Sequence, residues 1–170
     1  ALLRLQSMLE LLGRTSRFQS GAAVPVPESC DLATRITGQE AALAALAGLA
    51  HRRLRVSARG GFLSCDATLL TTMIRGMVGC AARYGAGDID LSCEAGANGG
   101  RVICSFPAEA GVTPGRDVFV DLAGGRLSEM VAEPVPGLAL VERMAEVAGL
   151  RLELAPAVGR RLALTLSKAA

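Results

Sequence analysis

The sequence predicts a two-layer α/β sandwich, in which three helices cover one face of a mixed β-sheet. The first observation is that three segments space their apolar residues as one face of a helix does, at residues 32–51, 66–84 and 137–148. The second is that residues 89–106 and 150–166 alternate apolar with polar residues on either side of a turn signal. Each of these two stretches is therefore predicted to be a β-hairpin.

A further helix opens the chain, and its leucines form one stripe. Leu2, Leu5, Leu9 and Leu12 follow a 3-4 spacing. A lone helix of this length is marginal in water, so we expect the stripe to be covered. Either it packs on its own domain, or it packs against another helix in an upstream segment or a second subunit. Because the chain starts with Ala inside the helical pattern, we expect residues upstream of it.

The predicted domain boundary follows this helix, where Pro25 and Pro27 disfavour regular helix. Asp66 is the expected N-cap of the central helix, which ends near Tyr84. The predicted organisation is a helix at residues 1–20, a linker at 21–29 and a single α/β domain at 30–170. Within that domain we expect a strand at 53–57, a turn at 59–61 and mostly loop at 107–136.

The composition excludes several classes of function. Aromatic residues make up only 3% of the chain, so the stacking platforms of single-strand nucleic-acid binders are absent. The formal net charge is +2, with acidic and basic residues interspersed, which gives no broad footprint for DNA. No apolar run is long enough to span a bilayer and no signal-peptide pattern is present, so we expect a cytoplasmic protein without a membrane span.

Five cysteines are present, an odd number without Cys-x-x-Cys spacing, and they are Cys30, Cys65, Cys80, Cys93 and Cys104. This pattern indicates neither a zinc site nor a disulfide framework, and reduced thiols packed as small hydrophobes are the better interpretation. If the first hairpin turns at Asn98 and Gly99, Cys93 lies opposite Cys104.

The element order and several strings resemble the end of a sensor histidine kinase of the two-component type. Residues 9–21, LELLGRTSRFQSG, look like the end of the second helix of the dimerisation and phosphotransfer hairpin. Residues 65–84, CDATLLTTMIRGMVGCAARY, look like the helix that carries the N-box, and residues 137–154, GLALVERMAEVAGLRLEL, look like the second glycine box with the following helix and strand. The resemblance implies an ATP-binding domain of the GHKL, or Bergerat, type.

The residues that the resemblance assigns to ATP and magnesium are altered. The two N-box asparagines fall on Gly76 and Cys80, and neither side chain offers the oxygen ligand that Mg²⁺ prefers. The aspartate that accepts the adenine amino group in the family falls on about Ala108. Glu109 could replace it only if the register shifts by one residue.

Of the second glycine box only Gly137 remains, and it follows Pro134-Val135-Pro136. Alternating glycines let backbone amides approach a phosphate, whereas each proline removes an amide donor. Losses at three nucleotide contacts therefore predict a domain that keeps the fold and binds no cofactor. A filled site is also expected, because the loop at 107–136 carries Val118, Phe119, Val120 and Leu122 and can collapse into it.

His51 is the only histidine and has to be weighed as a phosphate acceptor. In the family the acceptor lies on the first helix of the hairpin, whereas His51 ends a helix of the predicted α/β domain. A histidine that interacts with the helix dipole is the better interpretation.

The resemblance leaves three hypotheses for function. The first is a degenerate histidine-kinase-like signalling module, similar to ChpT-type histidine phosphotransferases. It would form a homodimer through its helical hairpin, and it would dock the receiver domain of a response regulator or pass phosphate without ATP. The second is an active, divergent kinase that uses ATP and magnesium. The third is an interaction domain outside two-component signalling.

Overall fold

A five-stranded mixed sheet forms the base of the structure, a computed structural model that describes residues 2–122 and 133–170. The strand order is β2-β4-β5-β7-β6, and only the pairing of β2 with β4 is parallel. The strands are β2 (Leu54–Ala58), β4 (Ile89–Gly96), β5 (Gly99–Pro107), β6 (Leu150–Ala157) and β7 (Arg161–Lys168). Both predicted hairpins, β4-β5 and β6-β7, are therefore confirmed.

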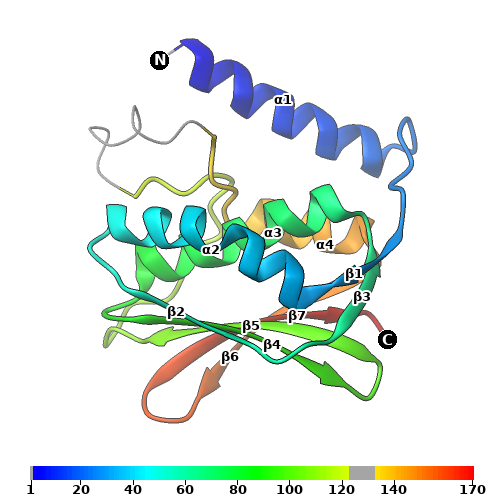
Figure 1. Ribbon diagram of the computed structural model, residues 1–170. Helices are drawn as coiled ribbons and strands as arrows, with labels where there is room; N and C mark the ends of the chain where they lie inside the picture. The colour runs from blue at the N-terminus through cyan, green and yellow to red at the C-terminus, as the bar shows by residue number, and fades with distance from the viewer. Residues whose placement is uncertain (1, 123–132) are drawn as a thin grey trace.

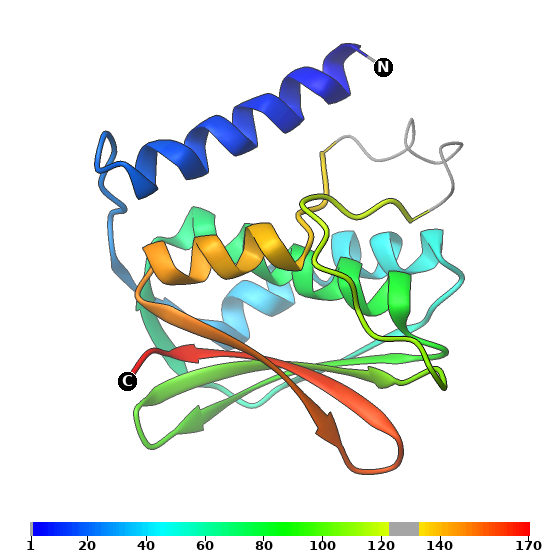
Figure 2. The same ribbon diagram turned by 180° about the vertical axis from the view of Figure 1, so that it is seen from behind.

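Three helices cover one face of this sheet, as Figures 1 and 2 show from opposite sides. They are α2 (Leu32–Leu49), α3 (Ala67–Tyr84) and α4 (Leu138–Val147). The helix α1 (Leu2–Gln19) lies outside this layer, on the side away from the sheet. The arrangement confirms the predicted α/β sandwich. Within the described residues, no helix is both long enough and apolar enough to cross a bilayer.

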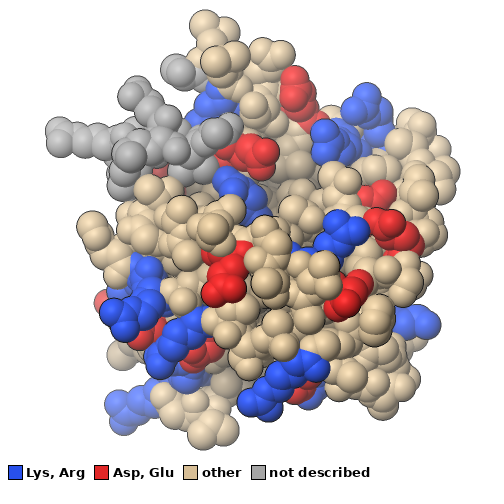
Figure 3. Space-filling view, viewed as in Figure 1, with Lys and Arg blue, Asp and Glu red and all other residues tan. Residues whose placement is uncertain are grey.

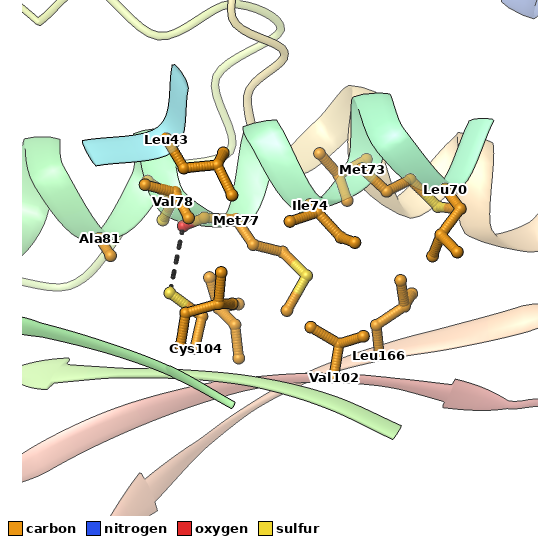
Figure 4. Close-up of a cluster of buried hydrophobic side chains, with 14 of the residues drawn as sticks. Leu43, Leu70, Met73, Ile74, Met77, Val78, Ala81, Val102, Cys104 and Leu166 are labelled. Atoms are coloured by element: carbon orange, nitrogen blue, oxygen red, sulfur yellow. Dashed lines mark hydrogen bonds between the residues drawn. The ribbon is translucent and has the colours of Figure 1, made fainter. Parts of the chain in front are cut away.

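The core lies between α3 and the sheet. Figure 4 shows Ile74 and Met77 of α3 facing Val102 and Cys104 of β5, and all four side chains are fully buried. Met73, which lies beside Leu70 on the same helix, is fully buried as well. Burying a large apolar side chain is worth about 1.5–3 kcal/mol, so this layer supplies much of the stability. A core built from aliphatic and sulfur-containing residues follows from a sequence with so few aromatics.

The start of α3 is held as the sequence predicts. Asp66 is the N-cap, and its Oδ1 accepts hydrogen bonds from the backbone N–H groups of Thr68 (2.9 Å) and Leu69 (3.2 Å). Its other oxygen, Oδ2, accepts the N–H of Val26 at 3.1 Å. One carboxylate therefore fixes both the helix start and the segment that leads from α1.

A second, two-stranded sheet was not predicted. It pairs β1 (Glu28–Asp31) with β3 (Phe62–Cys65) in antiparallel register. The strand β1 begins inside the segment 21–29 that the sequence assigns to a linker. Each strand has only four residues, and the pairing joins segments far apart in sequence, so no local periodicity marks them.

The turn of the first hairpin lies one residue earlier than predicted. Gly96 pairs with Gly99, so Ala97 and Asn98 form the turn. As a result Cys93 pairs with Val102, and the predicted pairing of Cys93 with Cys104 is wrong. Gly99 has a φ of +109°, which favours glycine at the first position of β5. All five cysteines are free and buried, as expected for packed thiols.

The leucine stripe of α1 is only partly covered. Leu12 is half-buried against the core, together with Leu11 and Phe18. By contrast, Leu2, Leu5 and Leu9 keep exposed fractions of 85%, 57% and 61%. The C-terminal half of α1 therefore packs on its own domain, while three leucines of the stripe lack a partner within the described part of this chain.

Candidate functional site

The candidate site is the side of α3 on which the sequence places Gly76 and Cys80. Pro136 and Val141 pack directly against Gly76. A Cβ atom at Gly76 would overlap Val141 Cγ2 and would lie only 2.8 Å from the carbonyl oxygen of Pro136. Since real Cβ atoms do not come this close to backbone oxygens, no larger residue fits here without movement of the chain.

One turn further along α3, Val135 packs in the same way against Gly79. A Cβ atom at Gly79 would overlap Val135 Cγ1, and Val120 Cγ2 would lie 3.8 Å away. Val135 and Val120 are each only 3% exposed. These apolar side chains therefore cover the face of α3 that would line a nucleotide site.

The segments that cover α3, residues 117–122 and 133–137, are joined to one another by backbone hydrogen bonds. The N–H of Val120 donates to the carbonyl of Val135 at 2.9 Å, and the N–H of Gly137 donates to the carbonyl of Val118 at 2.8 Å. Val120, one of the apolar loop residues expected to collapse toward this side of α3, is buried beside Gly79. Val118 remains 45% exposed, while Phe119 and Leu122 are half-buried against the core. Residues 123–132 of the predicted loop, which include Gly124 and Gly125, lie outside the described residues.

The N-terminus of α4 is occupied by backbone carbonyl groups. The N–H of Ala139 donates to the carbonyl of Asp117 at 3.1 Å, next to the bond from Gly137 to Val118. A Cβ atom at Gly137 would overlap this Asp117 carbonyl. Gly137 thus permits a close approach of the chain to itself. Two amides at this helix start, those of Gly137 and Ala139, are therefore already used and cannot meet a phosphate.

Cys80 lies in this packed region and is 1% exposed. Burial raises the pKa of its thiol to about 12, and the nearby negative charge of Asp117 adds to the effect. The side chain is therefore a neutral thiol near neutral pH. It offers no hard oxygen ligand where the family places its magnesium-binding asparagine.

Ala108 and Glu109 follow the end of β5. The N–H of Ala108 donates to the carbonyl of Arg160 at 2.9 Å, and Ala108 forms an isolated bridge with Gly85. Glu109 is exposed, and its carbonyl accepts the N–H of Val112 at 3.1 Å in a turn. Neither residue provides a buried carboxylate for an adenine amino group.

His51 lies outside this site. It follows the end of α2, where it adopts a left-handed φ of +57°, and its side chain is exposed. Its N–H donates to the carbonyl of Gly48 at 3.0 Å, which helps to end the helix. Within residues 2–122 and 133–170, no cluster of histidine, cysteine and acidic side chains could hold a metal ion.

Sequence reasoning missed the polar contacts that hold the covering segments on α3. The Tyr84 hydroxyl donates to Asp117 Oδ2, and Arg75 Nη2 donates to the carbonyl of Glu133 at 2.8 Å. These pairs are 33 and 58 residues apart in sequence, so no local pattern could have indicated them.

Comparisons with known proteins are informative only at the level of structure. No protein-family model matches the chain, and no curated protein matches it either. The histidine kinase AdeS of Acinetobacter baumannii superimposes with a TM-score of 0.69 at 15% identity, covering 95% of this chain and 76% of that one. The cytoplasmic segment of the histidine kinase QseC superimposes with a TM-score of 0.64 at 13% identity, covering 94% and 92%.

A third similar structure is full-length ShkA in complex with AMPPNP, with a TM-score of 0.68 at 17% identity. Here the match covers 98% of this chain but only 36% of ShkA. Identities this low establish the fold and leave the activity open. The chain has the fold of a sensor histidine kinase with its ATPase-type domain, as the sequence resemblance implies.

Proposed function

We propose that this chain is a degenerate histidine-kinase-like module of a two-component or phosphorelay system, which works without ATP. The observation that carries the proposal is the packing of Val135 and Pro136 on Gly79 and Gly76. Because these contacts leave no space for even one more carbon atom, a nucleotide could enter only if the segment before α4 moved away from α3.

Two chemical features support the same conclusion. Gly76 and the neutral thiol of Cys80 cannot replace two amide oxygens as ligands for magnesium. At the start of α4, the carbonyls of Asp117 and Val118 take the amides that a phosphate would need. Loss of the metal ligand and loss of the anion site are independent, and each alone would weaken binding of Mg-ATP.

The module would act by docking. We infer that a receiver domain of a response regulator is its partner, either as a docking target or as the recipient of phosphate from a histidine outside this chain. The exposed Leu2, Leu5 and Leu9 favour a homodimer, because a stripe of leucines in water is an aggregation liability. We place the protein in the cytoplasm, in keeping with the fold match to the cytoplasmic segment of QseC.

An active, divergent kinase is the second candidate. It is favoured by the fold match to ShkA, a protein whose structure contains AMPPNP. The two candidates differ in one measurable property, which is the binding of Mg-ATP to the purified chain.

Thermal unfolding with and without millimolar Mg-ATP tests this property. A ligand at about 100 times its Kd stabilises a protein by about 2.7 kcal/mol, which raises the Tm by several degrees. We expect no such rise, while an active sensor histidine kinase domain measured in parallel should show one. Magnesium tripolyphosphate serves as the control for binding through the phosphates alone. A rise that requires the adenosine portion would contradict the proposal and favour the kinase.

A further inference from the structure

A cavity of about 430 Å³, open to solvent and lined by both polar and apolar side chains, lies between α1 and the helical layer. Side chains from α1, α2, α3 and the segment at residues 133–134 line it. Three of them are arginines on three different helices: Arg14 of α1, Arg35 of α2 and Arg75 of α3. On the face seen in Figure 3, basic and acidic side chains are intermixed, so this convergence depends on the fold and not on a general excess of positive charge.

The three arginines are incompletely neutralised. Arg14 is exposed and forms no ion pair within the described residues. Arg35 pairs with Glu28 at 3.2 Å, in a contact where both side chains remain about half exposed. Such exposed pairs are weak and leave the other donors of the guanidinium available.

Arg75 is the most constrained of the three. Its Nη2 donates to the carbonyl of Glu133 at 2.8 Å, whereas its Nε is buried and has no acceptor among the described residues. Burial lowers the pKa of this guanidinium, because its charge is partly removed from water. A buried donor without an acceptor is unfavourable, so the described residues satisfy the guanidinium of Arg75 only in part.

Two glutamates also line the cavity, Glu10 and Glu133. Glu10 accepts a hydrogen bond from Gln6 Nε2 at 3.3 Å, and Glu133 contacts Arg75 through its backbone carbonyl. Neither carboxylate forms an ion pair with a cavity arginine within the described part of the chain, although the negative charge of Glu133 acts on Arg75 and opposes the lowering of its pKa by burial. Three positive and two negative side chains leave a net charge of +1 on the lining.

We propose that this cavity binds a phosphate group, either free or carried by a small molecule. Guanidinium groups form paired hydrogen bonds with phosphate oxygens, and arginines from three helices line this cavity. The hydroxyl groups of Thr68 and Thr71 also line it and can donate to further oxygens. Because the arginines belong to three helices, the bound phosphate would fasten α1 to the α/β domain.

Calorimetric titration of the full chain with inorganic phosphate, at constant ionic strength, tests the site. The informative variant is Arg14→Gln, since Arg14 is exposed and its loss leaves the fold intact. Its matched control is Arg17→Gln, which removes the same charge from an exposed position of the same helix outside the cavity. We expect Arg14→Gln to weaken phosphate binding about tenfold, as the loss of one charge-assisted hydrogen bond would. Arg17→Gln should bind as the wild type does.

Arg75→Gln provides a second, independent reading and should also weaken binding. Equal phosphate affinity in Arg14→Gln and Arg17→Gln would overturn the proposal, as would tighter binding of malonate than of phosphate. Comparison with glycerol phosphate distinguishes a free ion from a phosphorylated small molecule, and tighter binding of either form supports the site.

This test is separable from the test of the proposed function. An adenosine-dependent response to Mg-ATP that persists in Arg14→Gln would contradict the proposed function alone. Loss of the contrast between Arg14→Gln and Arg17→Gln would contradict the phosphate site alone.

Discussion

The hydroxyl group of Tyr84 donates a hydrogen bond to Oδ2 of Asp117, which links the last residue of α3 to the loop that caps α4. The backbone carbonyl of the same Asp117 accepts the N–H of Ala139 at 3.1 Å. A single residue of the loop therefore contacts both helices that would border a nucleotide. This link helps to hold the covering segments in place.

The ionisation of Tyr84 reports directly on this link. Its hydrogen bond to the Asp117 carboxylate raises the pKa of the phenol above the usual 10.0, and burial adds to the rise. Tyr84 is the only tyrosine and the chain has no tryptophan, so tyrosinate absorbance follows this one group. We expect the pKa of Tyr84 to fall toward 10.0 in Asp117→Asn. Asp88→Asn, which removes a carboxylate paired with Arg55 at 3.2 Å, should leave it unchanged.

An unchanged Tyr84 titration in Asp117→Asn would mean that this hydrogen bond is absent in solution. Because the folded-state pKa is raised, the link contributes stability below about pH 10 and loses it as the pH rises further.

Substitution of Gly76 measures how tightly the site is filled. An added methyl group would meet Val141 and the Pro136 carbonyl, so Gly76→Ala should reduce the free energy of unfolding by about 1–3 kcal/mol. Gly38 of α2 has nothing within 4 Å of the position of a Cβ. Gly38→Ala should therefore stabilise the chain by about 0.5–1 kcal/mol, through helix propensity alone. Urea unfolding compares the two, and a stabilising effect of both changes would show that Pro136 does not cover α3.

Buried thiols should make the protein sensitive to alkaline pH. Burial raises the pKa values of Cys65 and Cys80 to about 12, and it raises that of Cys104 as well. In the unfolded chain these thiols ionise near 9.0, so above this pH the unfolded state releases protons that the native state retains. Stability should then fall from about pH 9 toward pH 12, by about 1.4 kcal/mol per pH unit for each thiol.

Cys80→Ala isolates one of these contributions. Urea unfolding at about pH 8 and about pH 10 should give a loss of stability that is smaller by about 1.4 kcal/mol in this variant than in the wild type. An equal loss in both would mean that Cys80 ionises normally and is open to solvent.

Thiol labelling followed by peptide mapping tests the accessibility of the same residue. Cys80 is 1% exposed and should react far more slowly than an engineered thiol at the exposed end of α1, introduced by Ser20→Cys. If both thiols were labelled at the same rate in the native protein, the nucleotide side of α3 would be open.

The stripe on α1 predicts a dimer. Leu5 and Leu9 are 57% and 61% exposed, and burying each in a partner would be worth about 1.5–3 kcal/mol. Leu5→Asp combined with Leu9→Asp should convert a dimer into a monomer in light scattering without lowering the stability of the α/β domain. Leu3→Asp, at a position off the stripe that is 81% exposed, should retain the dimer. A monomeric wild-type chain would refute the expectation.

Local periodicity was sufficient to predict the large elements. The apolar spacing before Tyr84 gave the buried face of α3, and the alternation on either side of Asn98 gave the first hairpin. The predicted position of the turn was wrong because Gly96, Gly99 and Gly100 offer several turn positions within a few residues. The strands β1 and β3 were missed because they exist only as partners of one another.

For the candidate site, the sequence alone predicts which nucleotide-binding side chains are missing. It predicts only part of the packing that covers α3. Gly76 and Cys80 were identified as poor substitutes for asparagine from the sequence alone. Pro136 was recognised as a lost amide donor, but its packing against α3 depends on the tertiary approach of α4. The cavity arginines come from three separate helices, and no sequence spacing could bring them together.

The hydrogen bonds of Asp66 to two separate segments have a mechanical consequence. Its carboxylate is bonded at once to the segment that follows α1, through Val26, and to the first turn of α3, through Thr68 and Leu69. A movement of α1 that displaces this segment would also displace the start of α3, in addition to any effect transmitted through the packing of Leu11, Leu12 and Phe18 on the core. A single carboxylate thus couples the segment that follows the N-terminal helix to the helix at the centre of the domain.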